Sequence, residues 1–348
     1  MTNETPRSLG YYMPAEWAWH DATWFSWPKN PLTFPPEILE EVEGTFAQMA
    51  SALSEGERVK ILVNDPEVGR RAHDILAEAG ARMTAVTFLH IRSSDVWIRD
   101  YGPTFLLHRH SGRKAAVKWE FNAWGEKYDD LLYDNATGRE VVKSSGVRYF
   151  QPGIIMEGGS IDVNGEGLVL TTEQCLLNKN RNPHLGRKDI ERYLHEYLST
   201  PEVLWLSSGI AGDDTDGHID DFARFASRSA VLCAHSDRGE NAPVLHRNWG
   251  ILTELKDRLG LELQRLPMPR PLYLPEEGGD LPASYANFYI GNKVVLLPVF
   301  DDAHDRDAME ILGSYFPGRE VVPISAKELI YGYGGIHCVT QQEPAEQG

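Results

Sequence analysis

The chain has 348 residues, 42% of them hydrophobic, and carries 34 basic against 51 acidic side chains. The formal net charge of −17 disfavours nucleic acid and anionic membranes as partners and favours cationic small molecules, although a merely soluble surface would show the same excess. No stretch approaches the ~18 consecutive apolar residues of a membrane span, and the N-terminal segment lacks the basic and apolar regions of a signal peptide. We therefore expect a cytoplasmic protein that binds neither nucleic acid nor membrane.

Apolar residues alternate between helical and strand-like spacing along the whole chain. In chain order the pattern predicts a helix at 36–53, a strand at 59–63, a helix at 66–79, strands at 83–89, 104–108, 115–119 and 168–171, a helix at 187–198, strands at 203–206 and 230–234, a helix at 245–259, strands at 286–290 and 293–298, and a helix at 305–315. No linker and no visible repeat interrupts this α/β pattern. The sequence therefore predicts one domain over residues 1–348, with peripheral tails at 1–10 and 343–348.

Three cysteines, an odd and sparse set, do not form a disulfide framework, so at least one should be a free thiol. Cys175 and Cys233 lie in apolar surroundings and are predicted to be core residues. Cys338 differs because it follows the glycine-rich segment 331–335, a context that can expose a reactive side chain while its neighbours stay packed. Cys338 is therefore the candidate nucleophile.

An indole is flanked by carboxylates in segment 94–103, where Trp97 lies between Asp95 and Asp100 with Arg99 beside them. A ring face and nearby anions both attract a delocalised cation, so the segment is a candidate binding site for a guanidinium-like group. An internal ion pair of Arg99 with an aspartate would explain the same residues.

Five carboxylates and one histidine lie within segment 212–221. If residues 217–221 are extended, His218 and Asp220 share one face, as an acid/base group and a cation-binding group would. A calcium-like loop is the alternative, although the spacing of a calcium-binding loop is absent. Glu157, which two glycines follow, is a weaker candidate because an ordinary turn would look the same.

Taken in this order, the segments resemble the agmatine deiminase family, which also includes the bacterial-type peptidylarginine deiminases. The matching segments are 13–17, 24–28, 97–103, 157–160, 170–183, 217–220, 281–289 and 337–342. The resemblance implies a fold that periodicity does not reveal, a five-bladed α/β propeller (the pentein fold) of ββαβ-type units around a central active site. It also implies that the chain is a single catalytic deiminase domain.

The resemblance further implies a division of roles at that site. Cys338 would be the nucleophile, His218 the general acid and base, Asp100 and Asp220 the guanidinium-binding carboxylates, Glu157 an orienting residue and Trp97 a wall of the pocket. No metal or organic cofactor is implied. Because carboxylates surround the thiol, the pKa of Cys338 should be raised until a cationic substrate binds. His337 would point to the opposite face of an extended segment, so it is predicted to be structural.

Agmatine is the predicted substrate, with N-carbamoylputrescine and ammonia as products and polyamine synthesis as the context. The family pattern often has an asparagine where this chain has Asp216, and an additional acid there would suit the distal ammonium of agmatine. Peptidyl-arginine is the alternative substrate, disfavoured because such an enzyme is usually exported. The sequence leaves the oligomeric state open, a homo-oligomer included.

Two alternatives come from other classes of protein. A cysteine protease could use Cys338, His218 and Asp220, but acyl transfer needs hydrogen-bond donors around an oxyanion rather than a surplus of carboxylates. A non-enzymatic polyamine- or metal-binding protein could use segment 212–221 alone. In that case, replacing Cys338 would leave binding intact.

Overall fold

The computed structural model describes residues 4–274 and 279–346, and its strands form small sheets that repeat one pattern. The helices are α1 Pro36–Ser54, α2 Pro66–Glu78, α3 Ile98–Tyr101, α4 Ala123–Glu126, α5 Asp134–Ser144, α6 Glu173–Leu176, α7 Arg187–Leu198, α8 Ala242–Leu259 and α9 Asp305–Tyr315. The strands are β1 Tyr11–Tyr12, β2 His20–Ser26, β3 Arg58–Val63, β4 Val86–His90, β5 Thr104–His108, β6 Lys114–Val117, β7 Arg148–Phe150, β8 Asp162–Val163, β9 Leu168–Thr172, β10 Glu202–Leu206, β11 Ala223–Phe225, β12 Ala230–His235, β13 Glu262–Pro267, β14 Leu272–Tyr273, β15 Asp280–Leu281, β16 Tyr289–Ile290, β17 Val294–Val299, β18 Glu320–Ser325 and β19 Gln341–Pro344.

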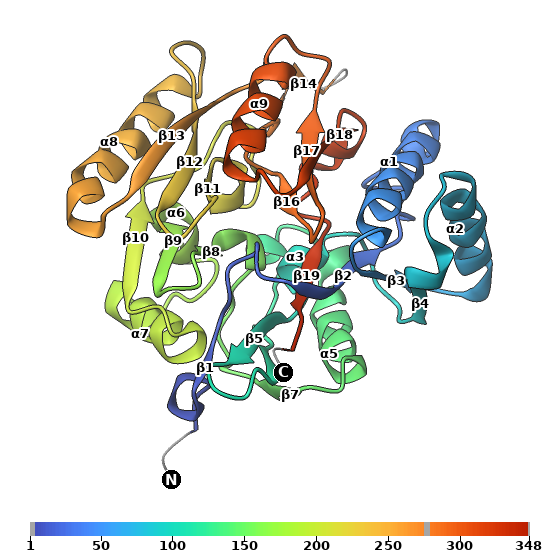
Figure 1. Cartoon of the computed structure of the whole chain (residues 1–348), viewed down its shortest axis with the longest axis horizontal. Helices are drawn as coiled ribbons and strands as arrows, with labels where there is room; N and C mark the ends of the chain where they lie inside the picture. Colours follow the sequence, from blue (N-terminus) through green and yellow to red (C-terminus); the bar gives the residue numbers. More distant parts are fainter. Residues whose placement is uncertain (1–3, 275–278, 347–348) are drawn as a thin grey trace.

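Five sheets in the described part of the chain share one topology, in which an antiparallel pair is followed by a parallel pair. Their strand orders are β19-β2-β3-β4, β1-β5-β6-β7, β8-β9-β10, β11-β12-β13 and β16-β17-β18. A parallel pair needs a crossover connection, and α1, α5, α7, α8 and α9 supply one in each sheet. The repeating unit is therefore ββαβ, and the predicted five-bladed α/β propeller is confirmed. Helices α1, α2, α7 and α8 lie at the periphery of the ring (Figure 1).

The ring closes by pairing the two ends of the chain. Strand β19 runs antiparallel to β2, with Gln341 opposite Trp24, and Figure 1 shows the two strands side by side. Glu343 is buried and forms ion pairs with Lys60 and Lys114. The predicted peripheral tail at 343–348 is therefore wrong for its first two residues, which belong to the closing strand.

Part of the segment predicted as an N-terminal tail, residues 1–10, also packs on the fold. Residues Arg7–Leu9 form a 3-10 helix, and Leu9 packs against the hydrophobic core around α7. Strand β1 follows directly and pairs with β5.

The five predicted helices are confirmed, whereas α5 is missed because its apolar spacing is weak and Gly138 interrupts it. The strand predicted at 83–89 begins only at Val86, after a 3-10 turn. The strand predicted at 286–290 is reduced to Tyr289–Ile290. The residues before it form a loop that approaches the centre of the ring. Within the described ranges, no helix combines the length and apolar character needed to cross a bilayer.

Candidate active site

A cavity of about 350 Å³ opens at the centre of the molecule, and segments from different blades line it. Its wall includes Trp97, Asp100, Trp124, Asp214 and Cys338. Trp97 is buried and packs against Phe34, with ring centroids 6.2 Å apart. The cavity therefore combines aromatic surface, carboxylates and a thiol, as the sequence predicts for residues 97, 100 and 338.

Cys338 lies in a turn at 336–339 rather than in an extended segment. The Asn287 side chain anchors this turn, because its Oδ1 accepts the His337 backbone N–H at 2.8 Å while its Nδ2 lies 3.3 Å from Cys338 Sγ. Burial, followed by the charges of Asp220 and Asp221, raises the pKa of Cys338 well above its ordinary value. The free thiol is therefore protonated at neutral pH, in agreement with the prediction.

Asp100 lies in the short helix α3, where two uncharged groups donate hydrogen bonds to its carboxylate. The Gly159 backbone N–H donates to Oδ1 at 2.9 Å, and the Trp124 indole N–H donates to Oδ2 at 3.0 Å. Gly159 has to be a glycine, because a Cβ there would lie 2.5 Å from Nδ1 of His218. Burial raises the pKa of Asp100, and the carboxylates of Asp220 and Glu157 raise it further against the opposing charge of His218.

A turn, and not the predicted extended strand, brings His218 and Asp220 next to Asp100 and Cys338, which line the cavity. Gly217 has φ +90°, and Ile219–Asp221 forms a 3-10 helix. The Asp213 carboxylate accepts the backbone N–H groups of Gly217 and His218 at 2.7 and 3.2 Å. Asp213 thus shapes the turn, so it does not fit the role of a calcium ligand that the alternative would give it.

The His218 ring lies between the carboxylates of the site. Its Nδ1 is 3.8 Å from Asp100 and 4.0 Å from Asp220, and its Nε2 is 4.0 Å from Glu157. Burial lowers the pKa of His218, but Asp100, Cys175 and Asp220 together raise it well above the ordinary value. The carboxylates around the ring therefore favour its protonated form.

Glu157 is held by Arg181, whose Nε donates to Oε1 at 2.9 Å, and both side chains are fully buried. Arg181 also forms an ion pair with Asp216, and Lys127 contacts the same carboxylate at 2.9 Å. Two cations thus neutralise Asp216, which is not among the residues that line the cavity. The predicted contact of Asp216 with substrate stays a prediction, and the pairing of its carboxylate with Arg181 and Lys127 disfavours it.

Cys175 is buried, as predicted, but the core prediction misses its neighbours. Its sulfur lies within 4.8 Å of a His218 ring nitrogen and of a Glu157 oxygen. Cys233, in contrast, is a core thiol whose pKa burial alone raises to about 12.

His337 is buried and is not among the residues that line the cavity, as expected of a structural residue. Its Nδ1 nevertheless lies 2.6 Å from Asp220 Oδ2, a contact that the prediction of an extended segment missed because the chain turns at 336–339. The sequence carried a signal for some of the missed residues, since Asn287 and Arg181 fall within the matching segments 281–289 and 170–183.

Comparison with known proteins agrees with this geometry. Residues 12–344 match the Porphyromonas-type peptidyl-arginine deiminase family. The chain belongs to this family. A putative agmatine deiminase of Legionella pneumophila is 38% identical over 98% of this chain and 97% of its own length.

Other relatives of this deiminase family are similar over nearly their full length. The agmatine deiminase of Ectopseudomonas mendocina is 38% identical, and the alignment covers 99% of this chain and 98% of that one. The solved structure of the agmatine deiminase of Enterococcus faecalis superposes with a TM-score of 0.90 at 30% identity, and it covers 100% of this chain and 99% of that one. The family, the fold and the cavity therefore point to one class of enzyme, a hydrolase of amidine C–N bonds.

Proposed function

We propose that this chain is an agmatine deiminase, which hydrolyses agmatine to N-carbamoylputrescine and ammonia in putrescine biosynthesis. The observation that carries the proposal is a pair of buried carboxylates, Asp100 and Asp220, beside the thiol of Cys338. One of them, Asp220, keeps Oδ1 buried with no hydrogen-bond partner among the described residues. Such an acceptor calls for a donor, which a bound ligand can supply.

A guanidinium group satisfies this requirement. It is planar and cationic, and its N–H donors match carboxylates on two sides. Asp100 and Asp220 would fix its plane and keep its charge, while Trp97 forms part of the wall. Glu157 Oε2 is a further buried acceptor without a partner in the described residues, and it would receive another N–H. The bound cation also lowers the pKa of Cys338, because it offsets the surrounding carboxylates.

The first half of the reaction forms a covalent intermediate. The Cys338 thiol loses its proton to solvent as the cation binds, and its thiolate attacks the central guanidinium carbon to form a tetrahedral adduct. His218, in its protonated form, gives its proton to the departing nitrogen. The C–N bond breaks, ammonia leaves, and an amidino-thioether on Cys338 remains.

The second half restores the enzyme. His218, now neutral, takes a proton from water, and the resulting hydroxide attacks the same carbon. The C–S bond breaks, the ureido product leaves, and Cys338 returns as a thiolate that regains its proton when the cationic substrate is absent. No step needs an oxidant or a reductant.

Asp214 is better placed than Asp216 to meet a distal ammonium group. It lines the cavity and accepts a hydrogen bond from the Tyr128 hydroxyl. Burial raises the pKa of Asp214 to about 6, so the carboxylate is ionised at neutral pH. A chain with a terminal ammonium fits such a wall better than a peptide does, which favours agmatine over peptidyl-arginine.

The test compares agmatine, free arginine and an arginine-containing peptide, with ammonia and ureido product as readouts and Cys338→Ala as the control. We expect turnover of agmatine, and none that is detectable with the variant. Turnover of the peptide alone would retain the chemistry and replace the substrate. If none of the three compounds reacts with the wild-type protein, the proposal fails.

A further inference from the structure

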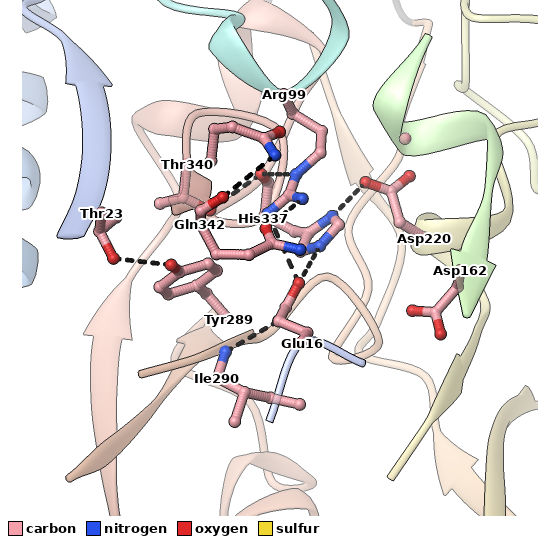
Figure 2. Close-up of polar contacts among 12 residues, drawn as sticks. Glu16, Thr23, Arg99, Asp162, Asp220, Tyr289, Ile290, His337, Thr340 and Gln342 are labelled. Atoms are coloured by element: carbon pink, nitrogen blue, oxygen red, sulfur yellow. Dashed lines mark hydrogen bonds and ion pairs between the residues drawn. The ribbon is translucent and has the colours of Figure 1, made fainter. Parts of the chain in front are cut away.

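The imidazole ring of His337 lies between two buried carboxylates, as Figure 2 shows. Its Nδ1 is 2.6 Å from Asp220 Oδ2, and its Nε2 is 2.7 Å from Glu16 Oε2. His337 is 2% exposed, Asp220 is fully buried and Glu16 is 7% exposed, so water does not screen these contacts. Both ring nitrogens therefore face an acceptor at hydrogen-bond distance.

This geometry determines the protonation state of the ring. A neutral imidazole has one N–H, so one of its two nitrogens would direct a lone pair at a carboxylate oxygen. Buried lone pairs in such contact repel each other, whereas an imidazolium donates from both nitrogens. The His337 ring therefore carries both protons.

The charges around the ring support the same state. The buried cluster contains the acids Glu16, Asp162 and Asp220 and the bases Arg99, Arg224 and His337. Arg224 forms ion pairs with Glu16 and Asp162. With His337 protonated, three cations balance three anions. With a neutral ring, the negative charges of these six groups would outnumber the positive ones, and Asp220 would keep only the more distant His218 beside it, at 4.0 Å.

We propose that His337 is a protonated positioning residue, which keeps Asp220 ionised and turns its Oδ1 towards the guanidinium group. The inference rests on the proposed function, because it takes Asp220 as a carboxylate that binds substrate. His337 occupies Oδ2 from behind, and Oδ1 is the oxygen that is left without a partner in the described residues. The carboxylate therefore cannot rotate without breaking a charge-assisted bond.

The electrostatics of Asp220 agree with this role. Burial raises the pKa of Asp220, but the hydrogen bond and charge of His337 bring it below the ordinary value. On the cavity side, three further groups face Asp220. They are the His218 ring, which favours its ionised form, and the carboxyl groups of Asp100 and Asp221, which oppose it. Without the imidazolium, Asp220 would face two further acids and would be protonated more easily.

Two substitutions of His337 separate its charge from its hydrogen bonds. In His337→Asn the amide nitrogen takes the place of Nδ1 and can still donate to Asp220, whereas in His337→Gln it takes the place of Nε2 and donates to Glu16. Both variants lose the positive charge. We expect the acidic limb of the kcat/KM profile to become steeper and to move to higher pH in both, because the pKa of Asp220 then rises towards the already raised pKa of Asp100. KM should rise more in His337→Gln, by about tenfold, since Asp220 then loses its donor.

His20→Asn is the matched control. The His20 ring is also buried, with Nδ1 3.1 Å from Glu57 and Nε2 2.7 Å from the carbonyl of Glu16, but no contact joins it to Asp220. This variant should lose stability and leave the pH profile in place. If His337→Asn and His337→Gln are folded and their acidic limbs coincide with that of the wild type, the inference is overturned.

A direct readout is needed in case the His337 variants do not fold. In protein labelled with ¹⁵N at histidine and carrying both His20→Asn and His218→Asn, one buried ring should show slowly exchanging N–H protons on both nitrogens, since Asp220 and Glu16 each accept one. A spectrum without such a ring would overturn the inference. Wild-type protein that is inactive on every guanidinium compound would instead overturn the proposed function, and the ring count would still test His337.

Discussion

The two carboxylates that face Cys338 are supported in opposite ways. Asp220 is held from behind by the His337 ring, part of a buried cluster of balanced charges. Asp100 accepts its hydrogen bonds from uncharged groups, the Gly159 amide and the Trp124 indole. Accordingly, the pKa of Asp220 is lowered in spite of burial, whereas burial raises the pKa of Asp100.

This difference shows how a buried site can bind a cation without accumulating negative charge beforehand. Asp220 is ionised before substrate binds, because the neighbouring His337 ring supplies the opposite charge. Asp100 has no such counter-charge behind it and relies on His218 and on the arriving guanidinium group. One carboxylate is thus prepared in advance, and the other becomes fully ionised as the substrate binds.

Asp220→Asn should have the largest effect, because it removes the carboxylate that is paired with a buried cation. The substitution removes one guanidinium contact, and we expect kcat/KM to fall about 10³-fold. It also leaves the His337 cation without one partner, so unfolding in urea should need about 3 kcal/mol less free energy. An Asp220→Asn protein as stable as the wild type would show that the buried cluster does not depend on this carboxylate.

Asp100→Asn should weaken turnover less, by about 10²-fold, and should change stability in the opposite direction. The folded-state pKa of Asp100 is raised above its unfolded value, so ionisation of this group opposes folding once the pH exceeds the folded value. Asparagine does not ionise. The variant should therefore be more stable than the wild type at about pH 8, and the gain should vanish as the pH falls through the raised pKa. A loss of stability at high pH would contradict this expectation.

Trp124→Phe should have a smaller effect, since it removes one uncharged donor from Asp100 and keeps the aromatic wall. We expect kcat/KM to fall about tenfold, the cost of one hydrogen bond to a charged group. The acidic limb of the profile should also move to higher pH, because that bond favours the ionised form. Trp97→Phe is the control, since no hydrogen bond to Asp100 is lost with it.

Local sequence patterns predicted the parts of the molecule that local physics determines. The amphipathic helices α1, α7 and α9 follow from apolar spacing, and their bounds agree within one residue. The nucleophile stood out because a glycine-rich segment precedes Cys338. The propeller itself came from resemblance, since its short strands contain too few residues to show a repeat.

Part of what the sequence missed comes from the assumption that short segments near the site are extended. At 217–221 and 336–339 the chain turns, so alternation cannot say which side chains share a face. The contact of His337 with Asp220 was missed for that reason. The pairing of Asp216 was missed for another reason, because Arg181 lies 35 residues away in the sequence and is brought close only by the fold. Ring closure by β19 is likewise a long-range pairing.

Cys175→Ala should have the smallest effect. It tests His218, the group that lies beside both Asp100 and Asp220. His218 lies at similar distances from Asp100 and Asp220, and Cys175 is among the groups that raise its pKa. Removing the sulfur should lower that pKa, so less of the general acid is protonated at high pH. We expect kcat to fall about threefold at neutral pH, the cost of a weak hydrogen bond, with the basic limb of the kcat profile moved to lower pH.

The acidic limb should not move, because the ionisable neighbours of Cys175 are His218 and Glu157 rather than Asp100 and Asp220. Cys233→Ala is the matched control, since it also removes a buried thiol, one that belongs to strand β12 and points into the core. It should lower stability and leave both limbs in place. If Cys175→Ala changes stability alone, as the control does, the sulfur is only a core atom, and the protonation of His218 depends on Asp100 and Asp220 without further help.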